Sequence, residues 1–314
     1  IDSGLRDDDV TLVCAPMFHV AGLNMVATPS FLTGGTVVVT GAFDPGEVLA
    51  LIAERRITVM FGVPAMFNAI AEHPAFATTD LSSMRRALCG GAAVPLATIS
   101  TWLDRGVAFL QGYGMSEASP GAIMLGTDVA AAKAGTTGVP MFFTDAEVRR
   151  PDGARVAPGE RGEVVVSGPN VMLGYWKRPQ ATAEAIRDGW FHSGDVAIVD
   201  DDGYATIVDR VKDMYISGGE NVYPAEIENA LFDHPDVVDC AVLGVPDPRW
   251  GEAGLALIVT RPGASPTADT LTAFLAGRLA RYKLPAHYQV VDELPRTGAG
   301  KVRKDQLRDR WWEP

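Results

Sequence analysis

Residues 10–43 contain no Asp, Glu, Lys or Arg, although 21% of the 314-residue chain is charged. So long an uncharged stretch has to be buried, either in a protein core or in a membrane. A membrane helix needs about 20 consecutive apolar residues, and Pro16, Gly22 and Pro29 interrupt this run. The run therefore predicts a buried strand, a helix and a second buried strand inside a folded domain.

Strand-like and helix-like segments alternate through the first half of the chain. Short apolar runs predict strands at residues 11–15, 36–40, 58–61 and 86–89. The segments Pro45–Arg55 and Pro64–Glu72 predict helices between them. Strands that alternate with helices imply a parallel sheet, so we expect an α/β fold here.

The pattern changes near residue 139. Short strands are predicted at residues 146–149, 162–167, 196–199 and 204–208. Turn sequences such as Pro151-Asp152-Gly153 and Asp201-Asp202-Gly203 separate them. This spacing indicates a β-rich subdomain that is built from hairpins.

A third region starts near Arg210. Helices are predicted at residues 224–233 and 268–279, and strands at 237–245 and 254–260. A tail that contains several glycines follows. These elements predict a small α+β domain of about 100 residues.

The charge balance limits the partners of the chain. Lys plus Arg number 27 and Asp plus Glu number 39, which gives a net charge of −12. This balance argues against a nucleic acid or an anionic membrane surface as partner, although it allows a small anionic ligand. Cys14, Cys89 and Cys240 lie far apart and indicate a reducing compartment. The five histidines show no spacing typical of a structural zinc site.

The most informative run follows the strand-like segment 107–110. It consists of Gln111, Gly112, Tyr113, Gly114, Met115, Ser116 and Glu117. The glycines let a ligand approach the backbone closely, and Tyr113 offers a flat face for a base. A carboxylate beside a hydroxyl, as at Glu117 and Ser116, suits Mg²⁺ that shares its shell with water and substrate phosphates. A tight turn with a hydrogen-bonded Glu117 is the alternative interpretation.

Other candidates are polar or small residues near predicted strand ends. Gly90, Gly91 and Ala92 would make room for a ligand at the carboxyl end of a sheet strand. Asp195 could accept hydrogen bonds from both ribose hydroxyls, and Arg210 could donate to the same sugar or to a phosphate. Taken singly, Asp195 and Arg210 fit a surface ion pair better.

Two glycine-containing loops lie in the last third of the chain. Gly218 and Gly219 precede a predicted helix and give a flexible backbone that something narrow could pass against. Lys301 follows Gly298 and Gly300. A lysine in such a loop is usually only solvated. It becomes functional if a developing phosphate charge lies within its reach.

In their order and spacing, these segments resemble the adenylate-forming superfamily of acyl- and aryl-CoA synthetases, luciferases and peptide-synthetase adenylation domains. The resemblance runs over essentially the whole chain. It implies an ATP- and adenylate-binding set made of Gly90, Gly91, Ala92, Gln111, Gly112, Tyr113, Gly114, Met115, Ser116, Asp195, Ile207 and Arg210. Ser116 stands where the family more commonly has Thr.

The resemblance also implies the remaining parts of a site. The acyl pocket would be formed by Phe18, His19 and Val20, and the tunnel for CoA by Ser217, Gly218 and Gly219. Glu117 would hold Mg²⁺, and Lys301 would be the catalytic lysine. A buried, hydrogen-bonded core histidine is the alternative for His19.

The domain boundaries follow from the same resemblance. We expect an N-terminal domain over residues 1–209, which is α/β up to about residue 138 and β-rich from about residue 139. Residues 210–213 would form a hinge with Lys212 at its centre, and residues 214–314 a mobile C-terminal domain.

The activity that the resemblance implies is that of an ATP-dependent acyl-CoA ligase. The carboxylate of an acid would attack the α-phosphate of ATP, and the CoA thiol would then take the acyl group from the adenylate. ATP, Mg²⁺ and CoA would be required, with no tightly bound organic cofactor. We expect a cytoplasmic protein that binds a small carboxylic acid and no nucleic acid, has no transmembrane segment and is able to form a homodimer.

The chain departs from the family pattern in one place. The family carries a phosphate loop of the form SGTTGxPKG well before the aromatic/His segment, and no such sequence precedes Pro16. Residues 135–140 (Gly-Thr-Thr-Gly-Val-Pro) look similar, but they follow Glu117, and Met141 occupies the place of the lysine. We therefore expect residues 135–140 to lead into the β-rich part, and the chain to belong to a longer polypeptide.

Three functions stay open at this point. A CoA ligase is favoured, and the apolar residues near Phe18 and Val20 favour a fatty or aryl acid over an amino or dicarboxylic acid. The second is an adenylation enzyme that loads a carrier protein, or a fatty acyl-AMP ligase. The third is a non-catalytic fragment, which rests on the missing phosphate loop alone.

Overall fold

The computed structural model describes residues 2–92, 94–210, 212–298 and 300–311. The chain divides into two compact units. The first consists of Ile1–Ser193 with Ala197–Ile207, and the second of Gly194–Val196 with Val208–Pro314. Among the described residues, no helix is both long and apolar enough to cross a membrane.

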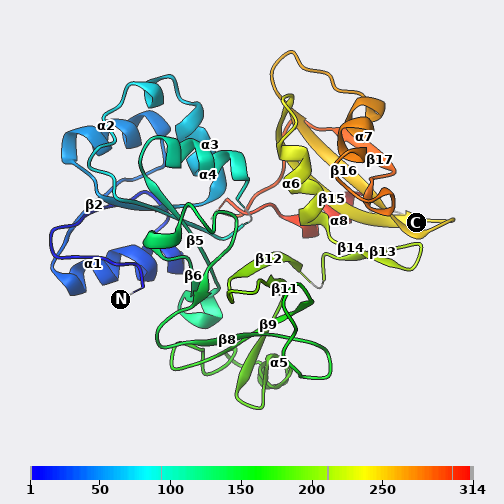
Figure 1. Ribbon diagram of the computed structural model, residues 1–314, viewed down its shortest axis with the longest axis horizontal. Coiled ribbons are helices and arrows are strands. Elements are labelled where there is room, and N and C mark those ends of the chain that lie inside the picture. Colours follow the sequence, from blue (N-terminus) through cyan, green and yellow to red (C-terminus); the bar gives the residue numbers. More distant parts are fainter. Residues whose placement is uncertain (1, 93, 211, 299, 312–314) are drawn as a thin grey trace. The chain divides into compact units, whose positions relative to one another are not determined.

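A seven-stranded sheet forms the first part of the first unit (Figure 1), in the order β2-β1-β3-β4-β5-β6-β7. The strands are β1 (Val10–Val13), β2 (Thr36–Val39), β3 (Val59–Gly62), β4 (Arg86–Gly90), β5 (Ala108–Gly114), β6 (Gly121–Met124) and β7 (Val139–Pro140). Strands β1 to β5 pair in parallel, and β6 and β7 are antiparallel. The predicted parallel α/β sheet is confirmed.

Helices cover both faces of this sheet. They are the π-helix η1 (Ala21–Ala27), which continues into α1 (Thr28–Thr33), and α2 (Pro45–Arg55), α3 (Pro64–Glu72) and α4 (Leu96–Asp104). Figure 1 shows α2, α3 and α4 on one face and α1 on the other. Helix α2 begins where Asp44 Oδ1 accepts a hydrogen bond from Glu47 N at 2.8 Å, and it ends at Arg56, which adopts φ 52°.

Alternate residues of the central strands contribute to two separate cores, because successive side chains of a strand point to opposite faces. The strand residues in the core with α2, α3 and α4 are Leu12, Met60, Ala87 and Phe109. Their neighbours in the core with η1 are Val13, Phe61, Leu88 and Leu110. The central strands are therefore buried on both faces, which explains the uncharged residues of β1. The expected second buried strand is wrong, because β2 lies at the edge of the sheet with Thr36 and Val39 exposed, and Phe31 and Leu32 before it are exposed as well.

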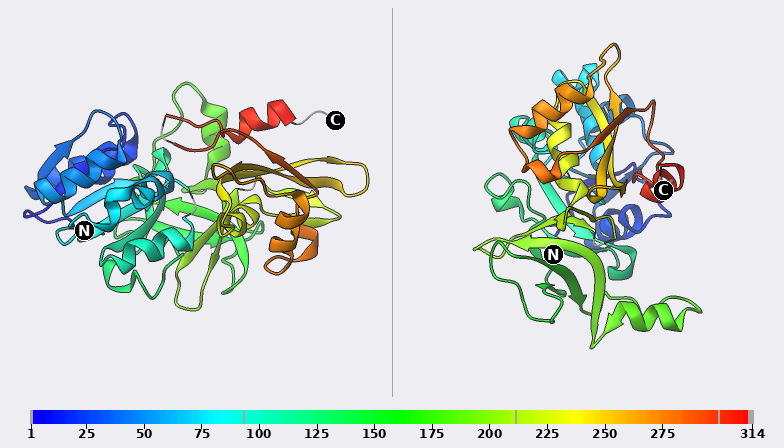
Figure 2. Two further views of the ribbon diagram at one scale, coloured as in Figure 1. Left: turned by 90° about the horizontal axis from the view of Figure 1, so that it is seen from above. Right: turned by 90° about the vertical axis from the view of Figure 1, so that its right-hand side faces the viewer.

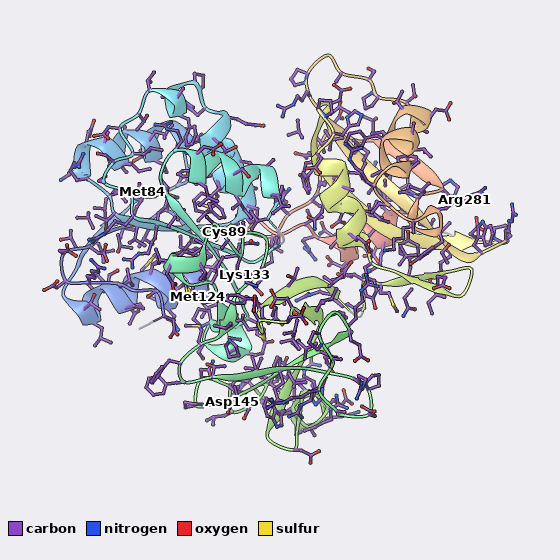
Figure 3. All side chains as sticks on the ribbon, in the orientation of Figure 1. Met84, Cys89, Met124, Lys133, Asp145 and Arg281 are labelled. Carbon is purple, nitrogen blue, oxygen red and sulfur yellow. The ribbon has the colours of Figure 1, made fainter. Side chains whose placement is uncertain are left out.

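A β-rich part follows, as the sequence predicted. Its five-stranded sheet consists of β8 (Asp145–Arg149), β9 (Arg161–Ser167), β10 (Ile186–Arg187), β11 (Trp190–Val199) and β12 (Ala205–Arg210), with helix α5 (Pro179–Ala185). The strand order is β10-β11-β9-β8, and β12 pairs with β11. Lys133, labelled in Figure 3, joins two parts of the first unit because it forms ion pairs with Asp200 at 2.7 Å and Asp202 at 2.6 Å.

The second unit contains another five-stranded sheet. Its elements are β13 (Tyr215–Ser217), β14 (Glu220–Val222), α6 (Pro224–Phe232), β15 (Val237–Asp247), β16 (Gly251–Thr260), α7 (Ala268–Ala276), β17 (His287–Val290) and α8 (Lys304–Trp311). The right-hand view of Figure 2 shows α7 and α8 on opposite sides of the long strands. Val242 packs in the core with α6 and α7, whereas its neighbour Leu243 packs in the core with Leu307 of α8.

The observed elements differ from the predicted ones in a few places. The predicted strand 196–199 is the end of β11, which already begins at Trp190. The predicted helix 268–279 ends at Ala276, because Gly277 follows it and weakens the helix. The sequence did not predict the helices α4, α5 and α8, the strands β6, β7, β10 and β17, or the short hairpin β13–β14.

Candidate active site

In the first unit, the predicted ligand-binding glycines lie where β4 and β5 end. Gly90 pairs with Gly112, and a Cβ on Gly90 would come within 2.9 Å of the Gly112 carbonyl oxygen. A Cβ on Gly114 would come within 1.8 Å of the Pro120 carbonyl oxygen. Only glycine fits at Gly114, so the close approach of two backbone segments fixes the shape of this region. Figure 3 labels Cys89 and Met124, which lie near the ends of β4 and β6.

The side chain of Gln111 is buried, and its Oε1 accepts a hydrogen bond from Gly135 N at 3.1 Å. The following Thr137 is also buried, and both its N–H and its hydroxyl donate to the Ala205 carbonyl oxygen, at 2.7 and 2.9 Å. Residues 135–140 therefore connect the end of β5 to the β-rich part. This arrangement supports the interpretation that the Gly-Thr-Thr-Gly sequence is not a phosphate loop.

Glu117 lies in a short 3₁₀ turn, Ser116–Ala118, directly after β5. Its Oε1 accepts a hydrogen bond from the Tyr175 hydroxyl at 3.0 Å, and its main-chain oxygen accepts one from Met172 N at 2.8 Å. Burial, and then the contact with Glu117, raises the pKa of Tyr175, so the phenol stays a donor at neutral pH. The carboxylate is thus oriented by a segment that is distant in sequence.

The acyl-pocket candidates precede the π-helix η1. His19 is half-buried, and its Nδ1 accepts a hydrogen bond from Ala21 N at 3.2 Å, whereas Phe18 is exposed. Val20 is the residue before the helix. A Cβ on Gly22 would come within 2.6 Å of the Pro16 carbonyl oxygen, so the helix packs tightly on the turn that carries Phe18. Single π-turns in helices often occur at functional sites.

Two methionines lie against the glycines of β5 and β6. A Cβ on Gly112 would lie 3.8 Å from Met25 Cε, and one on Gly121 would lie 2.4 Å from Met141 Sδ. The sequence reading gave neither methionine a role in the pocket. Met25 could have been found from its place in the helix after Gly22, but Met141 is brought in by the antiparallel pairing of β6 with β7.

In the second unit, the two ribose candidates contact each other directly. Arg210 Nε donates to Asp195 Oδ1 at 2.9 Å. Asp195 is buried, with a side-chain exposure of 9%, whereas that of Arg210 is 49%. The two residues therefore form an ion pair whose carboxylate is buried and whose guanidinium is exposed to solvent. Ile207, assigned to the same function, lies on β12 in the first unit and is half-buried.

The glycines at 218 and 219 form the turn of a hairpin. Ser217 pairs with Glu220, and the two glycines between them have φ values of 60° and 88°. Such values at both central residues are typical of a tight two-residue turn. The Gly218 N–H donates to the Trp250 carbonyl oxygen at 2.9 Å. The expectation of a flexible segment ahead of a helix is wrong here, because strand pairing and Trp250 hold this backbone.

Lys301 closes a compact loop. Thr297 N donates to the Lys301 carbonyl oxygen at 2.8 Å, and Lys301 N donates to Thr297 Oγ1 at 3.2 Å. Arg296 contacts both the Asp239 carboxylate and the Gly300 carbonyl oxygen. Ala299, within this loop, and Val211, within the predicted hinge, lie outside the described residues.

The hinge candidate Lys212 is exposed, and its carbonyl oxygen accepts a hydrogen bond from Arg308 Nη2 at 3.3 Å. Arg308 also forms an ion pair with Asp213 at 2.6 Å. Lys212 and Asp213 are therefore held by helix α8. Together with Asp213, Arg308 and Glu252, Lys212 lines a depression of about 610 Å³ in the second unit.

The three thiols are poorly placed to act as nucleophiles. All are buried, and burial raises the pKa of Cys14 to about 12 and the pKa values of Cys89 and Cys240 well above their usual range. A thiol that stays protonated is a poor nucleophile. Burial therefore disfavours an acyl-cysteine intermediate at these residues.

Two family models match the chain. The model of the AMP-binding enzyme matches residues 1–176, and that of the AMP-binding enzyme C-terminal domain matches residues 226–301. The chain belongs to the AMP-binding enzyme family. The predicted resemblance and fold class are thereby confirmed.

Several AMP-binding enzymes are similar over nearly the whole chain. A feruloyl-CoA synthase of Amycolatopsis sp is 56% identical over 99% of this chain and 63% of its own length. An indoleacetate–CoA ligase of Aromatoleum aromaticum is 43% identical over 97% of this chain and 60% of its own. The chain thus spans about three fifths of the length of these relatives.

A solved structure is similar as well. The o-succinylbenzoate coenzyme A synthetase of Bacillus subtilis, in complex with ATP and magnesium ion, matches with a TM-score of 0.86 and 34% identity. The match covers 98% of this chain and 62% of that one. The backbone of this AMP-binding enzyme therefore follows that of a CoA synthetase.

Proposed function

We propose that the protein containing this chain is an ATP-dependent acyl-CoA ligase that activates an apolar, aromatic carboxylic acid. The observation that carries this proposal is the 56% identity with a feruloyl-CoA synthase over 99% of the chain. The fold adds support, because the residues that the family pattern assigns to nucleotide, thiol tunnel and catalytic lysine lie in ordered turns and strand ends.

The first half-reaction joins the acid to AMP. A carboxylate oxygen of the acid attacks the α-phosphorus of ATP, the bond from that phosphorus to the bridging oxygen breaks, and pyrophosphate leaves. In this proposal the Lys301 ammonium neutralises charge on the acid and α-phosphate oxygens. Such a reaction depends mainly on positioning and electrostatic stabilisation.

Glu117 fits the family's magnesium position. Mg²⁺ is commonly held by one or two carboxylates together with substrate phosphates and water, and Glu117 is a single half-buried carboxylate whose Oε1 is oriented by Tyr175. When bound, the ion would neutralise negative charge on the phosphates. Glu117 and Tyr175 would orient the carboxylate toward it.

Asp195 and Arg210 are proposed to recognise the ribose. A buried carboxylate that is already oriented by a guanidinium can accept hydrogen bonds from the sugar hydroxyls with little loss of side-chain freedom. The 2.9 Å contact between Arg210 Nε and Asp195 Oδ1 supports this role.

The second half-reaction transfers the acyl group to CoA. The thiol sulfur attacks the acyl carbonyl carbon, the mixed anhydride breaks, AMP leaves, and the thiol proton is lost to solvent. We infer that the C-terminal part rotates about Lys212, so that Lys301 leaves and the Ser217–Gly219 turn takes its place. The absence of side chains on Gly218 and Gly219 would leave room for the pantetheine arm.

The proposed acid is apolar and aromatic. Met25 and Met141 lie against glycines of β5 and β6, and thioether side chains adapt well to flat aromatic groups. The named substrates of the two relatives, ferulate and indoleacetate, are aromatic acids. A fatty acid is the other apolar substrate that such a pocket accepts.

A substrate panel tests the proposal. The protein in its full natural length is supplied with ATP, Mg²⁺, CoA and either a hydroxycinnamic, an arylacetic or a straight-chain fatty acid, and AMP and thioester are measured. We expect AMP release that requires both acid and CoA, with kcat/KM at least about tenfold higher for an aryl acid, or about 1.4 kcal/mol. A fatty-acid preference would overturn the substrate. Transfer to a carrier protein but not to CoA would overturn the ligase.

A further inference from the structure

Side chains at both ends of the loop that carries Lys301 pack against the second unit, because Leu294 and Val302 belong to the core with Leu307. Arg296 and Val302 form an isolated β-bridge, and the Gly300 N–H donates to the Thr297 carbonyl oxygen at 2.8 Å. These main-chain contacts close the loop. They do not by themselves anchor it to the rest of the second unit.

The guanidinium of Arg296 adds a polar anchor within the loop. One of its terminal nitrogens donates to the Gly300 carbonyl oxygen, and the other forms an ion pair with Asp239 on β15. Asp239 is itself held, because its Oδ1 accepts a hydrogen bond from Cys240 N at 3.0 Å. The planar fork of an arginine can serve two acceptors at once, which a lysine cannot do in the same geometry.

The contact is sheltered from solvent. The side chain of Asp239 is 19% exposed and that of Arg296 is 31% exposed. Cys240, the neighbour of Asp239, is buried in the core with α6 and α7. The carboxylate is therefore carried by a strand that is paired with β16, and it ties the main chain at Gly300 to β15.

From this geometry we propose that Arg296, braced by Asp239, is a positioning residue for Lys301 in the adenylation half-reaction. A lysine side chain has four rotatable bonds, so the place its ammonium reaches depends on where its main chain is held. The residue before Lys301 is the one whose carbonyl Arg296 holds. This inference rests on the proposed role of Lys301.

The expected effect is specific to one half-reaction. A displacement of about 1 Å at a catalytic group can cost about 100-fold in rate. Arg296→Ala should therefore lower kcat for acid-dependent ATP–pyrophosphate exchange by roughly 10- to 100-fold, with the KM for ATP changed by less than about threefold. Thioester formation from preformed acyl-adenylate and CoA should stay within about twofold, because Lys301 has no part in that step.

The experiment compares four variants in the full-length protein. Arg296→Ala and Asp239→Asn remove one partner each, and Arg296→Lys keeps the charge but not the fork. Arg303→Ala is the matched control. Arg303 pairs with Asp305 at 2.6 Å, and its substitution removes the same charge from the same segment. We expect the exchange rates to follow the order wild type and Arg303→Ala, then Arg296→Lys and Asp239→Asn, then Arg296→Ala.

Two results would overturn the inference. One is an Arg296→Ala variant that loses both half-reactions equally, which indicates a general structural role. The other is an ATP–pyrophosphate exchange rate of Arg296→Ala that lies within about twofold of the rate of the Arg303→Ala control. Lys301→Ala is measured in parallel. If it retains full exchange activity, the proposed role of Lys301 fails. If it loses exchange while Arg296→Ala does not, only the positioning inference fails.

Discussion

The Tyr175 hydroxyl donates to Glu117 Oε1 at 3.0 Å, across 58 positions of sequence. This contact fixes the rotamer of the carboxylate that we assign to Mg²⁺. The removal of a hydrogen bond to a metal ligand typically lowers the affinity of the site for the metal. The pair therefore links the turn after β5 to the segment that precedes α5.

Replacing Tyr175 by Phe tests this link. The variant should need several-fold more Mg²⁺, up to about tenfold, for half-maximal ATP–pyrophosphate exchange, because Glu117 loses its orienting donor. Exchange rates measured over a Mg²⁺ titration give the Mg²⁺ concentration for half-maximal exchange. Tyr204→Phe is the control, since Tyr204 contacts Lys133 through its ring at 4.6 Å. An unchanged titration curve in Tyr175→Phe would contradict the role of Tyr175.

The two half-reactions should separate in Lys301→Ala. If Lys301 neutralises charge in the first step, its removal should lower exchange by roughly 100- to 1000-fold, as the loss of one charge-stabilising donor commonly does. Thioester formation from a preformed adenylate should fall far less. Rapid-quench measurement of both steps checks this expectation, and equal losses would refute the assignment.

The sequence predicted the sheet because local patterns specify it. Thr11, Val59 and Leu88 lie in short apolar runs with helices between them, and parallel strands buried on both faces have this pattern. The ends of β1 to β4 lie within one or two residues of the predicted ones, which is the usual uncertainty of element boundaries, whereas β5 continues four residues past its predicted end. The fold class and the family resemblance could therefore be predicted from the sequence alone.

The contacts that orient Glu117 and hold the loop of Lys301 could not be predicted from the sequence. Tyr175 reaches Glu117 and Asp239 reaches Arg296 only after the chain has folded, and neither pair has a local signal in the sequence. The hairpin at Gly218 is a different case. A Gly-Gly pair between two strand-like triplets is typical of a tight turn, so this hairpin does have a local signal in the sequence.

The structure also sharpens a test of the thiol tunnel. Gly219 has φ 88° and no atom within 4 Å of a Cβ placed on it, whereas a Cβ on Gly218 would lie 2.9 Å from the Trp250 ring. A residue with a Cβ at 219 therefore costs backbone strain of about 1–2 kcal/mol, but its Cβ meets no steric conflict. Gly219→Ala and Gly219→Phe share that strain and differ in bulk.

We expect Gly219→Phe to lower thioester formation from preformed adenylate at least about tenfold below Gly219→Ala, because the ring would fill the proposed path of the pantetheine arm. ATP–pyrophosphate exchange should be equal in the two variants. The same thioester rate in both would count against a tunnel at this turn.

Asp209 gives a prediction about stability and pH. It is buried, and its oxygens accept hydrogen bonds from Arg210 N at 2.7 Å and Ala225 N at 2.8 Å. Burial raises its pKa to about 6, and the nearby Lys304 offsets part of that effect. Lys304 stays charged: burial works to lower its pKa, but Glu228, at 2.7 Å, and Asp209 hold the pKa above its usual value.

The sign of the effect follows from this raised pKa. The folded protein binds the Asp209 proton more tightly than the unfolded chain does, so the stability that this proton contributes is present below about pH 4 and is lost as the pH rises through about 6. The shift corresponds to roughly 2–3 kcal/mol at most. In Asp209→Asn the group no longer titrates, so the stability advantage of the wild type over the variant should shrink as the pH rises from 4 to 7. Urea unfolding of both proteins across this range measures the difference, and a constant difference at every pH would contradict the assignment.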